Sequence, residues 1–531
     1  MSRVIFNNQP ATPQLNPGRA DIACFVGLVR VLPGATVPAG LASWLNSLSY
    51  SNAQIATITN IPILLESYTA FTSIFDDGSA GNAFGTDYVA TAIRSFFAQG
   101  GRRCYVVRVD DPVTPSDTPQ TKAAKLQEFL PSANYAPDSA ASWTGVGSLA
   151  ALEDVSFLVT PDLPILCASS HNGATGQLPA QPSGPEEFVE CSQGDITPQQ
   201  YRTFPSPAPR LKFSDYDTWA TSVATILNYL ASGSTTHQLH LREIQFIAAF
   251  PMPQDLDPAT AAENPSSAEI AQDIHEVIAA QLPEAPPPQG MVVNGNISSA
   301  FLQLAYPWLK TSGSSVLLES LEPPDGVLAG LLARNALTRG TFTSATKITP
   351  AEVYDVEPAL PAQEMQSSAV TLDWGTDPQS KALIERISLF GFTPTGLQLL
   401  SDVTAYPGES YRPAPVNRLV SVICRAARRM GESAVFQTNG PALWGRVQRF
   451  LQNLLTRLWS LNALSGATVQ EAFSVRCDRT TMTQNDLDNG RLIALVTFTP
   501  ATTIETITVT LAMETSGASV QEITANLAEV S

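Results

Sequence analysis

The sequence predicts an α/β protein, and three observations carry that prediction. Residues 86–101 have the apolar period of a helix that ends at a glycine pair, and the apolar stretch 103–109 follows directly as a buried strand. Residues 151–162 and 241–252 each hold an apolar run ended by proline, which is typical of buried parallel strands. A helix that leads into an apolar strand is the alternation from which α/β domains are built.

The remaining elements of the first part follow from composition. Residues 1–20 are rich in proline and asparagine and have no helical period, so we expect an extended segment. Residues 20–30 are apolar and rich in strand-forming side chains, which predicts a strand. Residues 62–76 begin as an apolar run and continue as an amphipathic one.

The middle of the chain mixes helices with long proline-rich stretches. Helices are predicted over 216–232 and 268–282, and residues 314–335 return to regular structure. The stretch 178–209 holds seven prolines and the stretch 251–288 holds eight, so both are expected to be surface excursions and not core.

The last third is expected to contain two helices followed by strands. The helices cover 418–430 and 441–464, and Asn439 and Gly440 separate them. Strands are predicted at 471–478, 490–500 and 504–513. The last of these alternates apolar residues with threonines, as a half-buried strand does.

Composition excludes several classes of function. At roughly 150 residues per domain, 531 residues suggest three or four domains. The 30 basic and 48 acidic residues give a net charge of -18, which excludes general binding to nucleic acid and disfavours an anionic lipid surface. No run of 18 apolar residues predicts a membrane-spanning helix, and the N-terminus lacks the apolar region of a secretory signal. Six scattered cysteines without a C-x-x-C pair fit reduced thiols, so we expect the chain to fold in the cytoplasm.

Candidate catalytic motifs are weak. Gly145 and Gly147 fit a loose dinucleotide fingerprint, but loop residues precede them, so a glycine turn into a short helix is the preferred interpretation. His237 and His240 lack acidic partners at metal-like spacing. His171 lies in a glycine-containing stretch without a G-x-S-x-G nucleophile elbow elsewhere in the chain. We therefore predict no catalytic, cofactor or metal site. A soluble α/β enzyme of the hydrolase or dinucleotide type stays the alternative.

Positive charge is concentrated in one segment. Residues 411–460 contain eight arginines, no lysine and one acid, Glu432; this sums to +7 and leaves -25 for the rest of the chain. On a helix, Arg446, Arg449 and Arg457 fall within a sector of about 80°. The neighbouring sector carries Leu443, Val447, Leu451, Leu454 and Leu458. A solvated face is the simpler interpretation, but eight arginines without lysine favour a docking surface for an acidic partner.

The two ends carry opposite charge and short apolar segments. Residues 1–20 have two arginines and no acid, whereas residues 512–531 have three glutamates and no base. Both ends hold apolar residues that could pair as added strands. These residues are Val4, Ile5 and Phe6 at the N-terminus and Val520, Ile523 and Leu527 at the C-terminus.

The C-terminal third resembles the phage tail sheath family, which includes the sheaths of phage-tail-like contractile injection systems. The order and spacing of three segments carry the resemblance: 436–444, 471–478 and 481–492. Two weaker likenesses lie at 147–161 and 323–340. The sequence departs from the family after Gly340, where TFTSAT replaces an aromatic-Lys-Ala-Pro-Ala run, and over 391–412, which matches poorly.

The resemblance implies an α+β inner domain built from both ends of the chain. It also implies an inserted α/β outer domain that is subtilisin-like and non-catalytic. The expected parts are an N-terminal arm 1–20, inner domain 21–110, inserted domain 111–365, C-terminal sheath domain 366–513 and C-terminal arm 514–531.

The implied function is mechanical. Sheath subunits form stacked hexameric rings around an inner tube, contract, and drive the tube through a target envelope. The expected partners are further copies of the chain, the tube protein, and baseplate and cap proteins, without nucleic acid or direct membrane insertion. Arg446, Arg449 and Arg457 are expected to hold the tube, and the terminal strands to join neighbours. We expect assembly in the cytoplasm as part of a phage-tail-like particle. A non-contractile shell or filament protein is the other alternative.

Overall fold

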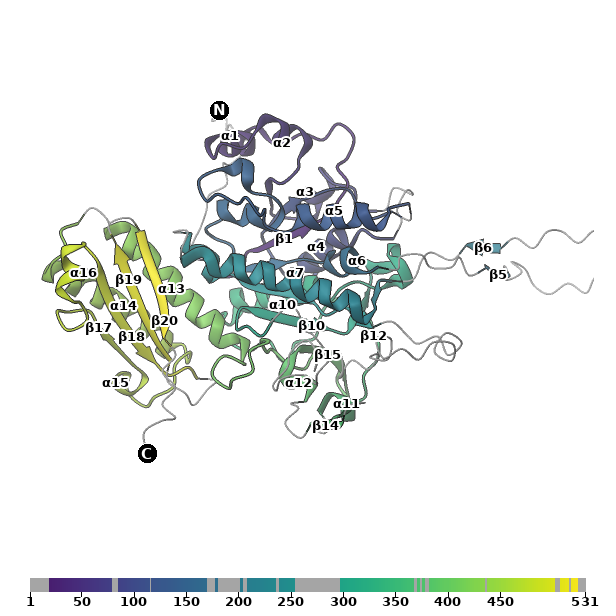
Figure 1. The fold of residues 1–531 in the computed structure, drawn as a ribbon. Coiled ribbons are helices and arrows are strands. Elements are labelled where there is room, and N and C mark those ends of the chain that lie inside the picture. Colours follow the sequence, from purple (N-terminus) through teal and green to yellow (C-terminus); the bar gives the residue numbers. More distant parts are fainter. Residues whose placement is uncertain are drawn as a thin grey trace, which may run out of the picture.

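The computed structural model of the chain describes most of its residues (Figure 1). The described ranges are 19–78, 85–114, 116–169, 177–179, 201–203, 208–234, 238–253, 297–366, 370–372, 375–377, 382–434, 437–501, 507–514 and 517–523. They form an α/β body and a C-terminal unit, which lie side by side (Figure 1).

The α/β body is built on an eight-stranded sheet with the order β16-β15-β10-β8-β4-β1-β3-β2. Its strands are β1 (Ala23–Gly27), β2 (Pro62–Leu65), β3 (Cys104–Arg108), β4 (Phe157–Val159), β8 (Gln245–Ala249), β10 (Leu302–Tyr306), β15 (Ser388–Thr393) and β16 (Gly396–Leu399). The six inner strands are parallel, and β2 and β16 pair antiparallel at the edges. Every residue of β1, β8 and β10 is buried, because helices and loops cover both faces of a parallel sheet. The predicted α/β class is confirmed.

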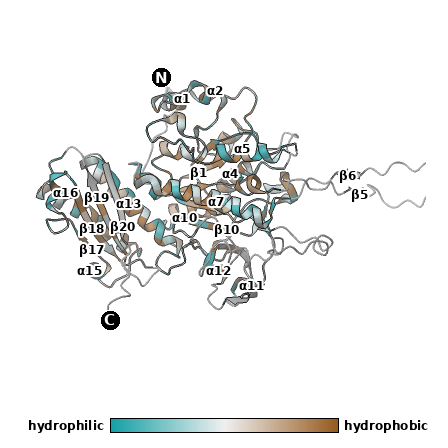
Figure 2. Cartoon of the chain, viewed as in Figure 1, coloured by the Kyte–Doolittle hydropathy of each residue, from teal (hydrophilic) through white to brown (hydrophobic). Residues whose placement is uncertain are grey.

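Helices and short connections cover this sheet. The longer ones are α1 (Ala39–Ser47), α4 (Tyr88–Ala98), α5 (Pro119–Phe129), α7 (Phe213–Ala231) and α10 (Asp325–Thr338). The shorter ones include α2 (Asn52–Thr57), α3 (Tyr68–Thr72), α6 (Leu163–Cys167), η2 (Gly145–Ala151) and η4 (Leu239–Glu243). Hydrophobic residues concentrate in the central strands and in the helices against them (Figure 2). The helices predicted at 86–101 and 216–232 are confirmed as α4 and α7.

Helices α4 and α10 pack unusually closely because glycine lies at their crossing. A Cβ added at Gly326 would lie 2.6 Å from the Cβ of Ala92, and one added at Gly330 would lie 2.7 Å from the Phe96 carbonyl oxygen. These glycines are therefore packing positions, not sites of flexibility.

The C-terminal unit has its own core. It consists of α13 (Ala414–Ala434), α14 (Pro441–Ser460) and an antiparallel sheet of β17 (Phe473–Arg476), β18 (Leu492–Phe498), β19 (Ile507–Glu514) and β20 (Gly517–Ile523). Along β18, Leu492, Ala494, Val496 and Phe498 are buried and the residues between them are half-buried, so one face of the sheet packs on the helices. The predicted helix pair and the three predicted strands are confirmed.

The expected domain boundaries at residues 110 and 365 are wrong. Strand β1 hydrogen-bonds to β3 on one side and to β4 on the other, so residues before and after 110 share one sheet. Strand β15 extends that sheet beyond 365. The N-terminal part thus joins the middle of the chain, because the fully apolar β1 needs a neighbour on each side. The subtilisin-like character of the middle part stays a prediction.

The expected surface excursions are described only in part. In the first excursion, β5 (Gln177–Pro179) and β6 (Tyr201–Thr203) pair with each other away from the body (Figure 1). The helix expected at 268–282 lies outside the described residues. Further short pairs are β7 (Arg210–Leu211) with β9 (Met252–Pro253), β11 (Trp308–Thr311) with β12 (Val353–Glu357), and β13 (Val370–Leu372) with β14 (Gly375–Asp377). Within the described ranges, no helix is both long and apolar enough to cross a membrane.

Candidate docking helix and interdomain junction

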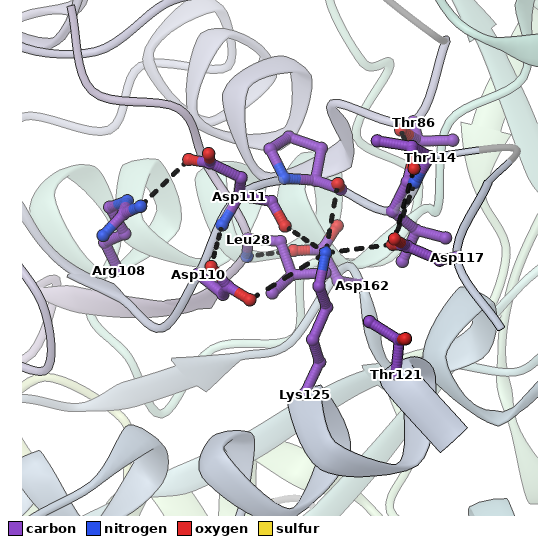
Figure 3. A network of polar contacts seen from close by, with 12 residues as sticks. Leu28, Thr86, Arg108, Asp110, Asp111, Thr114, Asp117, Thr121, Lys125 and Asp162 are labelled. Carbon is purple, nitrogen blue, oxygen red and sulfur yellow. Dashed lines mark hydrogen bonds and ion pairs between the residues drawn. The ribbon is translucent and has the colours of Figure 1, made fainter. Parts of the chain in front are cut away.

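The carboxyl edge of the parallel sheet is where α/β proteins commonly bind ligands, and here it is filled by internal contacts. Figure 3 shows Lys125 pointing into the loop that follows β3. Its Nζ donates to the carbonyl oxygens of Asp111 at 3.0 Å and Pro112 at 3.4 Å, and to the Asp117 carboxylate at 3.0 Å. Nearby, the Asp162 carboxylate accepts from the Leu28 backbone N–H at 2.5 Å. These contacts close the loop over the strand ends.

Four carboxyl groups are buried in this region without a cation in direct contact. Burial raises the pKa of Asp87 to about 6, of Asp325 to about 7 and of Glu322 to about 8, and raises that of Asp162 well above its usual range. Each has at least one oxygen without a hydrogen-bond partner. Among the described residues, no group of three histidine, cysteine or acidic side chains could hold a metal ion. The raised pKa values are therefore explained by desolvation inside a packed core.

The weak catalytic motifs take structural positions. Gly145 begins η2, donates its N–H to the Asn60 amide oxygen at 2.8 Å, and has no room for a side chain against the Phe129 carbonyl. This confirms the predicted glycine turn into a short helix. The ring of His240 is buried 3.2 Å from the Leu149 carbonyl oxygen, and burial together with Arg428 lowers its pKa to about 4. His171 and His237 lie outside the described residues.

Helix α14 presents the predicted arginines to solvent. Arg446, Arg449 and Arg457, called here the arginine face, are exposed, and none forms an ion pair with a described residue. The helix contains no acidic residue. Its opposite side buries Leu443, Val447, Leu451, Leu455 and Leu458. Leu455 thus takes the core position expected for Leu454, which is half-buried.

Both ends of α14 are held in place. Trp444 Nε1 donates to the Asn439 side-chain oxygen at 2.7 Å, and Trp459 Nε1 donates to the Gly466 carbonyl at 3.0 Å. Phe450 is 38% exposed beside Arg449, so the outer surface of the helix combines positive charge with an aromatic ring. Because the inner side packs on β17 and β18, the outer surface of α14 is held against the sheet and faces solvent.

Helix α13 joins the two units through its arginines. Its apolar face packs on the C-terminal sheet, and its polar face lies against the amino ends of the parallel strands. Arg418 forms a bidentate pair with Asp402, with N–O distances of 3.0 and 2.7 Å, and also donates to the Thr341 carbonyl. Burial alone would raise the pKa of Asp402, but the Arg418 guanidinium, together with hydrogen bonds from the Ala345 N–H and the Gln303 amide, outweighs burial and lowers it.

Two further arginines share one buried carboxylate. Arg425 Nε donates to Glu243 at 3.0 Å, and Arg428 donates to the same group at 2.8 and 3.1 Å. The Glu243 side chain is 2% exposed. Arg428 also pairs with Glu432 at 2.9 Å. A small, solvent-open pocket adjoins this junction, between Arg418, Arg425 and the strand ends.

The interpretation of all eight arginines as one docking surface is therefore wrong. Arg418, Arg425 and Arg428 are buried and paired inside the molecule, and Arg412 pairs with Glu409 at 2.8 Å at the surface. Glu243 and Asp402, the acidic partners of these arginines, lie outside the arginine-rich segment 411–460. No local pattern in the sequence identifies Glu243 or Asp402 as partners.

The terminal strand residues are described only in part. Val4, Ile5, Phe6 and Leu527 lie outside the described residues. Val520 and Ile523 lie on β20, opposite Leu511 and Thr508 of β19 in the same chain. Residues 517–523 are thus the fourth strand of the C-terminal sheet. Pairing of the terminal segments between subunits stays a prediction.

Comparison with known proteins gives matches in structure. No family model and no curated protein matches the sequence. A chain from the six-fold symmetrised baseplate of the anti-feeding prophage matches with a TM-score of 0.53 and 16% identity, covering 94% of this chain and 95% of that one. A chain from the helical sheath of the anti-feeding prophage in its contracted state matches with a TM-score of 0.51 and 18% identity, covering 95% and 96%. The chain therefore has the fold of a tail sheath protein, as the resemblance of its C-terminal third implies.

Proposed function

We propose that the chain is the sheath subunit of a phage-tail-like contractile particle. It polymerises as stacked hexameric rings around an inner tube and contracts to drive the tube through a target envelope. The observation that carries the proposal is the likeness to a helical sheath over nearly the full length of both chains. The proposed role is structural and not enzymatic. Baseplate and cap proteins would contact the two ends of the polymer.

The arginine face of α14 is the proposed contact with the tube. It supplies exposed guanidinium groups without an internal acid to neutralise them, on a helix that is held at both ends. Guanidinium binds carboxylates bidentately, so the facing tube surface should carry aspartate or glutamate. Phe450, the sequence neighbour of Arg449, adds an exposed aromatic ring at the border of that face. Before the contact forms, these guanidinium groups are exposed to solvent and are screened by salt. The rate at which sheath and tube associate should therefore fall at high ionic strength.

The terminal segments are the proposed ties between subunits. A strand of four or five residues added to a neighbour's sheet, at about 0.5–1.5 kcal/mol net per hydrogen bond, supplies several kcal/mol per subunit. Val4, Ile5 and Phe6 would form one such strand, and Val520, Ile523 and Leu527 the other. The ties would hold the lattice together while the subunits rotate.

Contraction needs little free energy per subunit. A gain of a few kcal/mol corresponds to roughly 100–200 Å² of additional apolar burial at about 25 cal/mol per Å². The buried ion pairs under α13 join the C-terminal unit to the α/β body, so motion of the body in the lattice would be transmitted to the arginine face. Summed over many rings, this displacement would drive the tube forward.

Negative-stain electron microscopy of the purified protein tests polymerisation. The proposal predicts striated, hollow tubes of uniform width. Discrete closed oligomers of a fixed small size would overturn it, because a sheath interface propagates helically and does not close.

A charge-reversal variant tests the tube contact. R446E/R449E/R457E should fold normally and lose co-purification with the co-expressed tube protein. The control R102E/R339E/R479E makes the same change in net charge at three other exposed arginines and should retain the tube. Retention of the tube by the first variant would show that another surface makes the contact.

A further inference from the structure

The N-terminal segment joins the body where α13 crosses the edge of the sheet. Residues Arg19 and Ala20 lead into β1, and the Arg19 side chain pairs with the buried carboxylate of Asp21, with Nε 2.8 Å from Oδ1. The backbone carbonyl of Arg19 accepts a hydrogen bond from Nη1 of Arg425 on α13. The first described residue of the chain is thus bound to a helix of the C-terminal unit.

The same guanidinium donates to three further acceptors in two other parts of the molecule. Its Nε donates to Glu243 at 3.0 Å, Nη1 donates to the Ser156 hydroxyl at 3.0 Å, and Nη2 donates to the Val155 carbonyl at 2.8 Å. The Arg425 side chain is 7% exposed. All three of its nitrogens are therefore used, and its acceptors come from η4, from the start of β4 and from the root of the N-terminal segment.

Only arginine can make this set of contacts. The planar guanidinium offers five N–H donors in a fixed fork, whereas lysine offers three donors from a single atom. A lysine at this position keeps the positive charge beside Glu243, but its one nitrogen cannot reach carbonyls on both sides of the fork. Arg418 lies on the same face of α13 and is also buried, yet its partners are Asp402, Gln303 and Thr341.

We infer that Arg425 anchors the root of the N-terminal segment to α13 and thereby sets where that segment leaves the subunit. Because α13 also carries the C-terminal sheet, one residue ties the N-terminal segment to the orientation of both units. The part of the inference in which the segment joins neighbouring subunits rests on the proposed function. The anchor itself does not depend on polymerisation.

Limited digestion with trypsin tests the anchor on the full-length protein. Trypsin cleaves after arginine, and the bond after Arg19 is protected while its carbonyl is held by Arg425 and its side chain by Asp21. The rate of loss of residues 1–19 is measured by intact-mass spectrometry for the wild type, R425K and the matched control R418K. Thermal unfolding of all three, followed by circular dichroism, establishes that digestion is carried out on folded protein.

R425K should release residues 1–19 at least tenfold faster than the wild type, while R418K should match the wild type. Cleavage after the buried Arg386 and Arg428 should stay slow in both variants, which separates loss of the anchor from general unfolding. Equal rates after Arg19 for R425K and R418K would overturn the inference. The result is read on the subunit, so it stands apart from whether the protein forms tubes.

Discussion

Replacing Glu243 by glutamine removes the one carboxylate that Arg425 and Arg428 share, and it tests how the two units are joined. The carboxylate receives three guanidinium hydrogen bonds of 2.8–3.1 Å and its side chain is 2% exposed. Breaking a buried pair by removing one partner costs about 3–5 kcal/mol, because the remaining charge is left desolvated. Arg428 keeps Glu432 at 2.9 Å, so Arg425 bears most of the loss. We therefore expect E243Q to lower the free energy of unfolding by about 3 kcal/mol.

Urea unfolding followed by tryptophan fluorescence and by circular dichroism measures this loss, since Trp444 and Trp459 report on the C-terminal unit. The matched control is E409Q, which removes a carboxylate 2.8 Å from Arg412 that is 69% exposed. An exposed pair contributes less than about 1 kcal/mol. If E243Q costs no more than E409Q, the buried junction does not hold the units together and the reasoning fails.

The same reasoning gives three further predictions. G326A should destabilise the protein by about 1–3 kcal/mol because the new Cβ would lie 2.6 Å from the Cβ of Ala92. G445A, where the new Cβ meets open space on α14, should stabilise the protein by about 0.5–1 kcal/mol. Thermal unfolding of both variants measures the difference. Asp325 and Glu322 have folded-state pKa values of about 7 and 8, above unfolded values near 4, so their stabilisation is complete below about pH 4 and is lost as pH rises through 7 to 8. Unfolding free energies between pH 5.5 and 8.5 should fall, and D325N should flatten the profile; an unchanged slope in D325N would contradict the assignment. Reversing the arginine face should change stability by less than about 0.5 kcal/mol per substitution, and a larger loss in denaturant unfolding would mean that the face is structural.

Local patterns identified the elements whose environment is uniform. Strand β3 is apolar and buried from Cys104 to Val107, and α14 repeats apolar residues at helical spacing with arginines beside them. That period predicts which residues of α14 are buried and which are exposed, except that Leu455 is buried in place of Leu454. Such features depend on residues within a few turns of one another, so sequence alone predicts them.

Long-range pairing could not be predicted in this way. Arg425 and Glu243 are 182 residues apart, and neither position has a local signal that identifies its partner. The same holds for the sheet, where β1 lies between β3 and β4 and so joins parts expected to be separate domains. The sequence shows the arginine-rich segment but not the acidic partners of Arg418, Arg425 and Arg428. Those partners decide which arginines of the segment are buried and which stay exposed.

The most direct test of the central claim is helical reconstruction by cryo-electron microscopy of the protein co-assembled with its tube. A contractile sheath predicts two lattices of the same subunit, a long and narrow one that encloses the tube and a shorter, wider one from which the tube has been displaced. In both, the α/β body and the C-terminal unit should keep the relative orientation fixed by the Arg425–Glu243 pair. A single lattice, unchanged with and without the tube, would contradict contraction and identify the chain as a static shell or filament protein.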